Sequence, residues 1–210
     1  MIRTDQDRPS VQYDDGADAW WIRASALGGC IRSLVATGRG VEPQPVPEWM
    51  QEKYDEGHNA EAVIEKLAME QRELVPMDTH KGLHVSFTHG DQVVNVSGSV
   101  DNFAIHRGGL GVPNQIDEYK ALGKTYVNAI ERLGENPDWR DVLKVLPAPY
   151  STQISVYMHG AAARFGQMIP VALVVGAKDE NGVVQRILPI VYIPEPPVSL
   201  EEIEKRAMLI

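Results

Sequence analysis

The chain has 210 residues, 43% of them hydrophobic, and a formal net charge of −9. This size and composition are typical of one sizeable globular domain and require no second one. The acidic balance argues against a protein that coats nucleic acid non-specifically, because affinity for the phosphate backbone depends mostly on lysine and arginine. The charge is still compatible with a locally basic groove that attracts a nucleic-acid strand. The candidates for such a groove are Arg23, Arg32, Lys120 and Lys124.

Membrane insertion and cysteine chemistry are both disfavoured. The sequence has no run of about 18 apolar residues, and Met1–Asp7 is polar without the apolar core of a signal peptide. We therefore expect a cytoplasmic protein with no membrane partner. Cys30 is the only cysteine, so one chain can form neither a disulfide nor a cysteine-ligated zinc or iron–sulfur site. Any metal must use oxygen or histidine ligands, and we expect Cys30 to be buried.

The N-terminal segment is expected to lack regular structure. Residues 1–19 are polar and predict a flexible lead-in, with ordered structure beginning at Trp20. Trp20 and Trp21 are expected to cap the core, and stacking on bases is the alternative.

The next segments predict helices. Residues 25–36 predict a turn into a short helix, and the prolines of 43–47 predict an extended linker. A helix is expected from about 48 to 71. Its core positions are expected to be Ala60, Val63, Ile64 and Leu67.

The second half mixes strands and helices. Strands are expected near 82–89, 92–97, 99–106, 114–121, 169–177 and 183–193. Helices are expected near 123–134, 138–146 and 150–165. Residues 194–210 are expected to be a C-terminal tail whose helix, from 198, is exposed.

Two carboxylates and an amine lie on neighbouring strand-like segments. Successive strand side chains face opposite ways, so Glu118 and Lys120 share one face while Asp117 and Tyr119 share the other. Mg²⁺ prefers carboxylate and carbonyl oxygens, which makes Asp101, Glu118 and the Tyr119 carbonyl candidate ligands. Lys120 is a candidate for orienting the attacking water or neutralising developing charge. The alternative is a solvated, charged sheet edge.

Two helices carry supporting candidates. His58 lies opposite the apolar stripe of its helix, where it either faces water or binds metal, and Glu61, three residues on, is a candidate to orient it. Gln153 precedes Tyr157 by one turn. A buried amide without a partner costs roughly 1–3 kcal/mol, so we expect Gln153 to be hydrogen-bonded. The alternative is a glutamine in water beside a core tyrosine.

Taken in order, these motifs resemble those of the RecB-like branch of the PD-(D/E)XK nucleases. The residues that carry the resemblance are Gly57-His58 with Glu61, Gly98 to Asp101, Glu118-Tyr119-Lys120, and Gln153 to Tyr157. The segment Ser25 to Arg32 also resembles the opening helix of phage exonucleases in that branch. The resemblance covers about residues 24–193. It implies an α/β fold with a central mixed β-sheet flanked by α-helices, the restriction-endonuclease-like core, and a nuclease domain at 20–193.

The resemblance also implies an activity. It implies Mg²⁺- or Mn²⁺-dependent hydrolysis of DNA phosphodiesters, commonly from an end, in recombination, repair or phage replication. The four-cysteine iron–sulfur cluster of some relatives is excluded by the single cysteine. The implied roles are metal binding by His58, Asp101 and Glu118, nucleophile positioning by Lys120, site organisation by Gln153 and Tyr157, and phosphate contacts by Ser25 and Arg32.

Two other functions stay open. One is a structure-specific endonuclease with the same site, and the other is a catalytically inert nuclease-fold module that binds DNA or a protein partner. The complete acid, acid, lysine set favours catalysis, while the acidic charge and an exposed C-terminal helix favour the inert module. DNA is the expected partner. A recombination or single-strand annealing protein and a second copy of the chain are further candidates.

Overall fold

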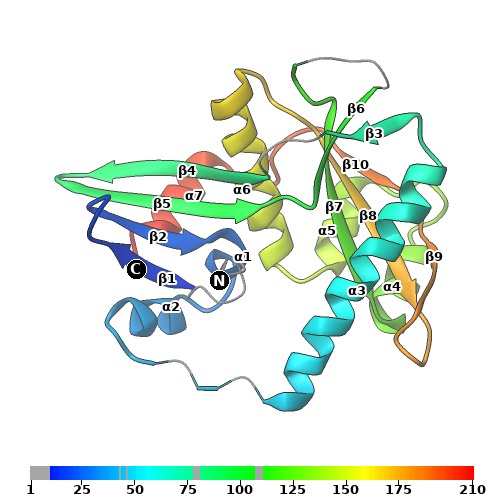
Figure 1. The fold of residues 1–210 in the computed structure, drawn as a ribbon, viewed down its shortest axis with the longest axis horizontal. Helices are drawn as coiled ribbons and strands as arrows, with labels where there is room; N and C mark the ends of the chain where they lie inside the picture. The colour runs from blue at the N-terminus through cyan, green and yellow to red at the C-terminus, as the bar shows by residue number, and fades with distance from the viewer. Residues whose placement is uncertain (1–9, 43, 46, 78–80, 107–110) are drawn as a thin grey trace.

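The computed structural model of the protein describes residues 10–42, 44–45, 47–77, 81–106 and 111–210, apart from the side chains of Met50, Lys53, Tyr54 and His58. Two β-sheets with flanking helices make up this part of the chain (Figure 1). The elements in chain order are β1 (Val11–Asp14), β2 (Ala19–Arg23), α1 (Ala24–Leu27), α2 (Ile31–Gly38), α3 (Glu48–Glu70), β3 (Leu74–Pro76), β4 (Gly82–His89), β5 (Gln92–Ser99), β6 (Asn102–His106), β7 (Gln115–Leu122), α4 (Lys124–Glu131), α5 (Trp139–Val145), α6 (Pro149–Phe165), β8 (Val171–Lys178), β9 (Val184–Ile187), β10 (Val191–Ile193) and α7 (Leu200–Ala207).

The larger sheet has six strands and is mixed. Its order is β10-β8-β7-β6-β3, with β9 paired to β8, and β7 runs parallel to β8 while the other pairs are antiparallel. The apolar sequence of β8 is buried along seven of its eight residues, as expected for a strand covered on both faces. On one face α3 packs Ala60, Ile64 and Ala68 against β7 and β8. Helices α4, α5 and α6 contribute to the core on the other face.

The smaller sheet has four strands in the order β1-β2-β5-β4, with only β2 and β5 parallel. Its core includes residues of α2 and α7. Helix α6 joins the two cores, because Val156 packs with the smaller sheet while Ile154 and Met158 pack with the larger one. A Cβ at Gly160 would lie 3.1 Å from the carbonyl oxygen of His84, so a glycine allows α6 to lie close to β4.

The predicted α/β fold class, a mixed sheet flanked by helices, is confirmed. The short strands β1, β2 and β3 were not predicted, and the strand expected near 183–193 divides into β9 and β10. Ordered structure does not begin at Trp20, because Val11–Asp14 pairs with β2, while residues 1–9 of the predicted lead-in and 43 and 46 of the linker lie outside the described residues. The helix α7 is not an exposed tail, since Ile203 and Ala207 are buried against the smaller core.

Three local expectations were also wrong. Cys30 is exposed, because it precedes α2 at a turn rather than lying on its buried face. Val63 is 41% exposed, since the buried stripe of α3 repeats every four residues through Ala60, Ile64 and Ala68. The strand expected from residue 99 begins at Asn102. In the part of the chain that the structure describes, no helix is long and apolar enough to cross a membrane.

Candidate active site

Strand β7 carries charged residues on both of its faces. Asp117 and Tyr119 face α3, and Tyr119 belongs to the core that α3 covers. Glu118 and Lys120 alternate with them and therefore face the α6 side, where Ile116 and Leu122 pack. The predicted division of this strand into two faces is confirmed.

Asp101 lies in the connection between β5 and β6, next to β7. Its Oδ2 accepts a hydrogen bond of 2.6 Å from the backbone N–H of Tyr119, and its backbone carbonyl accepts one from the Lys81 ammonium. Burial, followed by the charge of Glu118, raises the pKa of Asp101 to about 8, against the opposing effect of Lys120. Without a cation, the neutral form of Asp101 is therefore favoured more strongly than that of an ordinary aspartate.

Glu118 is fully buried, at 1% exposure, and is paired with Lys120. Apart from this ion pair, neither of its carboxylate oxygens accepts a hydrogen bond from a described residue. Burial raises the pKa of Glu118, and Lys120 opposes that shift. Burial lowers the pKa of Lys120, but the charges of Glu118 and Asp101 outweigh it and raise the pKa above its usual value. The ammonium also lies 5.3 Å from the Tyr150 ring centre.

Helix α6 supplies a hydrogen-bonded pair beside these charges. The Gln153 amide donates to the Tyr157 hydroxyl oxygen at 2.6 Å, and that hydroxyl donates to the Ser99 carbonyl at 2.8 Å. The prediction that Gln153 is hydrogen-bonded is confirmed. A Cβ at Gly98 would lie 2.7 Å from Cε1 of Tyr157, so only glycine lets the tyrosine ring pack this close to β5.

A cavity of about 580 Å³ joins these groups. Its lining contains Asp101, Lys120, Gln153 and Tyr157, while Glu118 is buried beneath it. Three further residues of the lining can contact an anion or a hydroxyl-bearing ligand through their side chains. They are Arg23 at the end of β2, Ser25 in α1, and Lys81, which precedes β4.

The cavity also has an aromatic side. Trp21 and His84 both line it, and their ring centres are 5.7 Å apart. Trp20, in contrast, packs against the smaller core. The expectation that both tryptophans cap the core therefore holds for Trp20 alone.

The structure brings together most of the predicted site, but not all of it. Ser25 and Glu61 line the cavity, and the charge of Glu61 raises the pKa of both Asp101 and Glu118. Arg32 and Lys124 are not part of that lining, so their roles stay predictions. The side chain of His58 lies outside the described residues; its position in α3 is one turn before Glu61.

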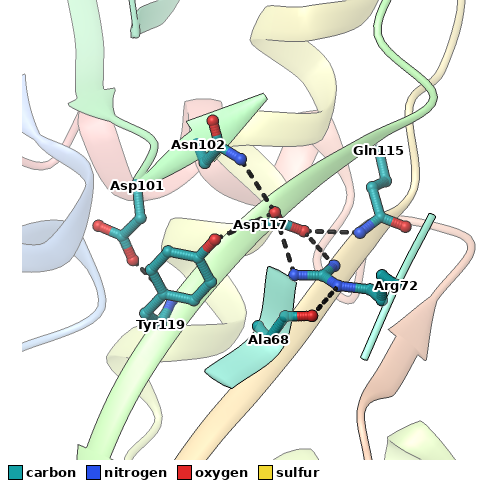
Figure 2. A network of polar contacts seen from close by, with 7 residues as sticks. All are labelled: Ala68, Arg72, Asp101, Asn102, Gln115, Asp117 and Tyr119. Atoms are coloured by element: carbon teal, nitrogen blue, oxygen red, sulfur yellow. Dashed lines mark hydrogen bonds and ion pairs between the residues drawn. The ribbon is translucent and has the colours of Figure 1, made fainter. Parts of the chain in front are cut away.

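The opposite face of β7 holds a different acid, Asp117, which is fully buried (Figure 2). Arg72 donates to its two oxygens at 2.8 and 3.3 Å. The further donors are Gln115 at 2.6 Å, Asn102 at 3.1 Å and the Tyr119 hydroxyl at 3.2 Å. Neither Arg72 nor Lys81 was identified from the sequence. The only signal for Arg72 was Asp117 itself, since a buried acid requires a partner.

A larger hollow, of about 740 Å³, lies beside β3. Its charged lining residues are Arg72 and Glu73, with His106 as a further titratable group. Arg72 is already paired with Asp117. Glu73 is the one acid among the described lining residues, so the hollow offers no pair of carboxylates for a metal. The smaller cavity is the better candidate for chemistry.

The donor set of the smaller cavity fits a hard divalent cation. Apart from the Lys120 ion pair, the buried oxygens of Glu118 lack donors among the described residues, and a cation would offset the raised pKa of Asp101. Within the described residues, no group of three or more His, Cys, Asp or Glu side chains is arranged to hold a metal. Mg²⁺ usually binds through one or two carboxylates together with water and substrate phosphate, so two acids meet its requirement.

Comparisons with known proteins give a likeness in fold. No protein-family model and no curated protein matches the chain. An alkaline exonuclease from Laribacter hongkongensis is 14% identical in a match with a TM-score of 0.51 that covers 89% of this chain and 84% of the other. The structure of SSO0001 is 15% identical, with a TM-score of 0.48 and coverage of 90% and 73%. The chain thus shares the overall fold of the alkaline exonuclease.

Proposed function

We propose that the protein is a metal-dependent deoxyribonuclease that hydrolyses DNA from an end. The observation that carries the proposal is a pair of acids beside Lys120: Asp101 lines the cavity, and Glu118 is buried next to it. Apart from the Lys120 ion pair, the Glu118 oxygens have no donor among the described residues. A buried carboxylate whose charge is only partly compensated is costly in a stable protein, and a bound cation reduces that cost. The fold shared with an alkaline exonuclease supports a nuclease.

In this proposal Asp101 and Glu118 would hold Mg²⁺ or Mn²⁺. The N–H and C=O of a strand residue point to the same edge, so the carbonyl of Tyr119, whose N–H bonds Asp101, is a further ligand at that edge. His58, one turn before Glu61, is the predicted ligand from α3. When bound, such a cation lowers the pKa of water and stabilises negative charge on a phosphoryl oxygen.

The remaining groups bind and orient the reactants. The raised pKa of Lys120 keeps its ammonium charged, so it can orient the attacking water and oppose charge on the phosphate. Gln153, held by Tyr157, presents its amide to the cavity. Arg23, Ser25 and Lys81 would contact the phosphates of the bound strand. Arg32 and Lys124 would contact DNA outside the cavity.

The test compares end-labelled linear DNA with covalently closed circular DNA, in Mg²⁺, in Mn²⁺ and in EDTA. We expect loss of linear DNA alone, and only with metal. Cleavage of the closed circle would favour the structure-specific endonuclease. If neither DNA is cut with either metal, the nuclease proposal fails, and a gel-shift assay with the same DNA would then test for an inert binding module.

A further inference from the structure

The acid on the far face of β7 is tied to the position of Asp101. Asp117 and Asn102 are register partners, and they form the last pair between β6 and β7 on the side of the cavity. Beyond this pair Asp101 crosses to the N–H of Tyr119, two residues further along β7. The Asp117 carboxylate binds the side chains of both Asn102 and Tyr119. The carboxylate therefore fixes Asn102 of β6, which follows Asp101 in the chain, and Tyr119 of β7, whose N–H binds Asp101.

The same carboxylate also fixes α3 to this point. Arg72 follows the end of α3, and its Nε donates to the Ala68 carbonyl at 3.2 Å while its two terminal nitrogens bind Asp117. Figure 2 shows the guanidinium lying between the end of the helix and the strand. A two-bond contact of this kind defines an orientation as well as a distance. Asp117 thus joins α3, β6 and β7 at one place.

Stability alone does not explain a buried ion pair here. Apolar residues of similar volume are often as stable as a buried pair, or more stable. What an apolar contact lacks is direction, whereas five donors converging on one carboxylate define where each donor lies. The groups so defined flank Asp101, which lines the cavity, and precede Glu118, which is buried beside it.

We propose that Asp117, together with Arg72, is a positioning residue that sets the separation of Asp101 from Glu118 so that both acids can bind one cation. The inference rests on the proposed function, because it presupposes a cation at that cavity. Asp117 itself contacts neither the cation nor DNA. Residues that hold the ligands of a metal typically change metal affinity by about 10–100-fold when they are replaced.

The test measures binding of Mn²⁺ alone to the metal-free protein by electron paramagnetic resonance, beside the melting temperature of each variant. Asp117→Asn keeps the shape of the side chain and removes its charge, and we expect it to weaken Mn²⁺ binding about tenfold. The control is Ile203→Ala, which removes a fully buried side chain from α7 in the smaller core. It should lower the melting temperature and leave Mn²⁺ affinity unchanged.

The outcomes separate the two proposals. If the wild type binds no Mn²⁺, the proposed metal site fails. If the wild type binds and Asp117→Asn binds equally well, or if Ile203→Ala weakens binding as much, the positioning role is overturned. Should Asp117→Asn fail to fold, Asn102→Ala removes only one donor from the carboxylate. A reduction of a few fold in Mn²⁺ affinity is then expected, and an unchanged affinity would overturn the inference.

Discussion

The two faces of β7 bury acids that differ in their hydrogen bonding. Asp117 accepts hydrogen bonds from four side chains and is fully satisfied by the protein. Glu118, its neighbour, is paired with Lys120 and otherwise lacks donors among the described residues. A satisfied buried acid stabilises or positions the structure around it, whereas an unsatisfied one marks a place for something that is bound. The difference separates a structural acid from a candidate metal ligand one residue away.

The largest expected effect is on the rate of DNA hydrolysis, from a change on the face of β7 that carries Glu118 and Lys120. Lys120→Ala removes the ammonium beside Glu118, and we expect the rate of DNA hydrolysis to fall by about 10²–10³-fold, as for loss of one group that stabilises developing charge. Lys144→Ala is the control, because that side chain is 73% exposed on α5, outside the cavity lining. End-labelled DNA degradation measures both. Equal rates for the two variants would contradict the role of Lys120.

On the opposite face the expected effect is on stability. Asp117→Asn leaves the Arg72 charge buried without its partner, and breaking a buried pair costs about 3–5 kcal/mol. Urea denaturation measures this loss in the free energy of unfolding, and the dependence of that free energy on urea concentration should stay unchanged. Arg140 pairs with Asp138 on the surface, where both side chains are more than half exposed. Asp138→Asn is therefore the matched control, because the amide oxygen can still accept from the Arg140 N–H. If Asp117→Asn lowers the free energy of unfolding by less than about 1 kcal/mol, as is typical for a surface pair, the proposed difference between the two faces is wrong.

A smaller effect is expected where α6 meets β5. Gly98→Ala places a Cβ 2.7 Å from the Tyr157 ring, and such overpacking typically costs about 1–3 kcal/mol. The displaced tyrosine should also lose its bond to Ser99. Gly123→Ala is the matched control, since a Cβ there meets no described atom within 4 Å. Equal melting temperatures for the two variants would show that the cavity wall is loosely packed.

The smallest effect concerns pH in the absence of metal. The folded pKa of Asp101, about 8, lies above its usual value of 3.8. Between about pH 4 and pH 8 the folded protein therefore holds a proton that the unfolded chain has released, and this group makes stability fall as pH rises. Asp101→Asn should remove that dependence, which for a single group amounts to at most about 1.4 kcal/mol per pH unit. Asp91→Asn, at the exposed β4–β5 turn, should not. Parallel pH profiles of wild type and Asp101→Asn would contradict the raised pKa.

Part of the site was predictable because regular strands and helices relate side chains that are close in the sequence. Glu118 and Lys120 are two residues apart, and Gln153 and Tyr157 are one helical turn apart, so each pair follows from local geometry. Arg72 lies 45 residues from Asp117, and no local pattern selects it among the other arginines. The strands β1, β2 and β3 were missed for a related reason. They are four, five and three residues long, and they are tied into the sheets by β2 pairing with β5 and β3 pairing with β6, which lie farther along the chain.

The most direct test of the account is the melting temperature of the metal-free protein with and without Mg²⁺ at about pH 8, for the wild type and for Glu118→Gln. A ligand at 100 times its dissociation constant stabilises the folded state by about 2.7 kcal/mol, and each 1 kcal/mol raises the melting temperature of a chain this size by about 2–4 °C. We predict such a rise for the wild type and little or none for Glu118→Gln. No rise in the wild type, or the same rise in both proteins, would contradict the claim that this face of β7 binds a cation.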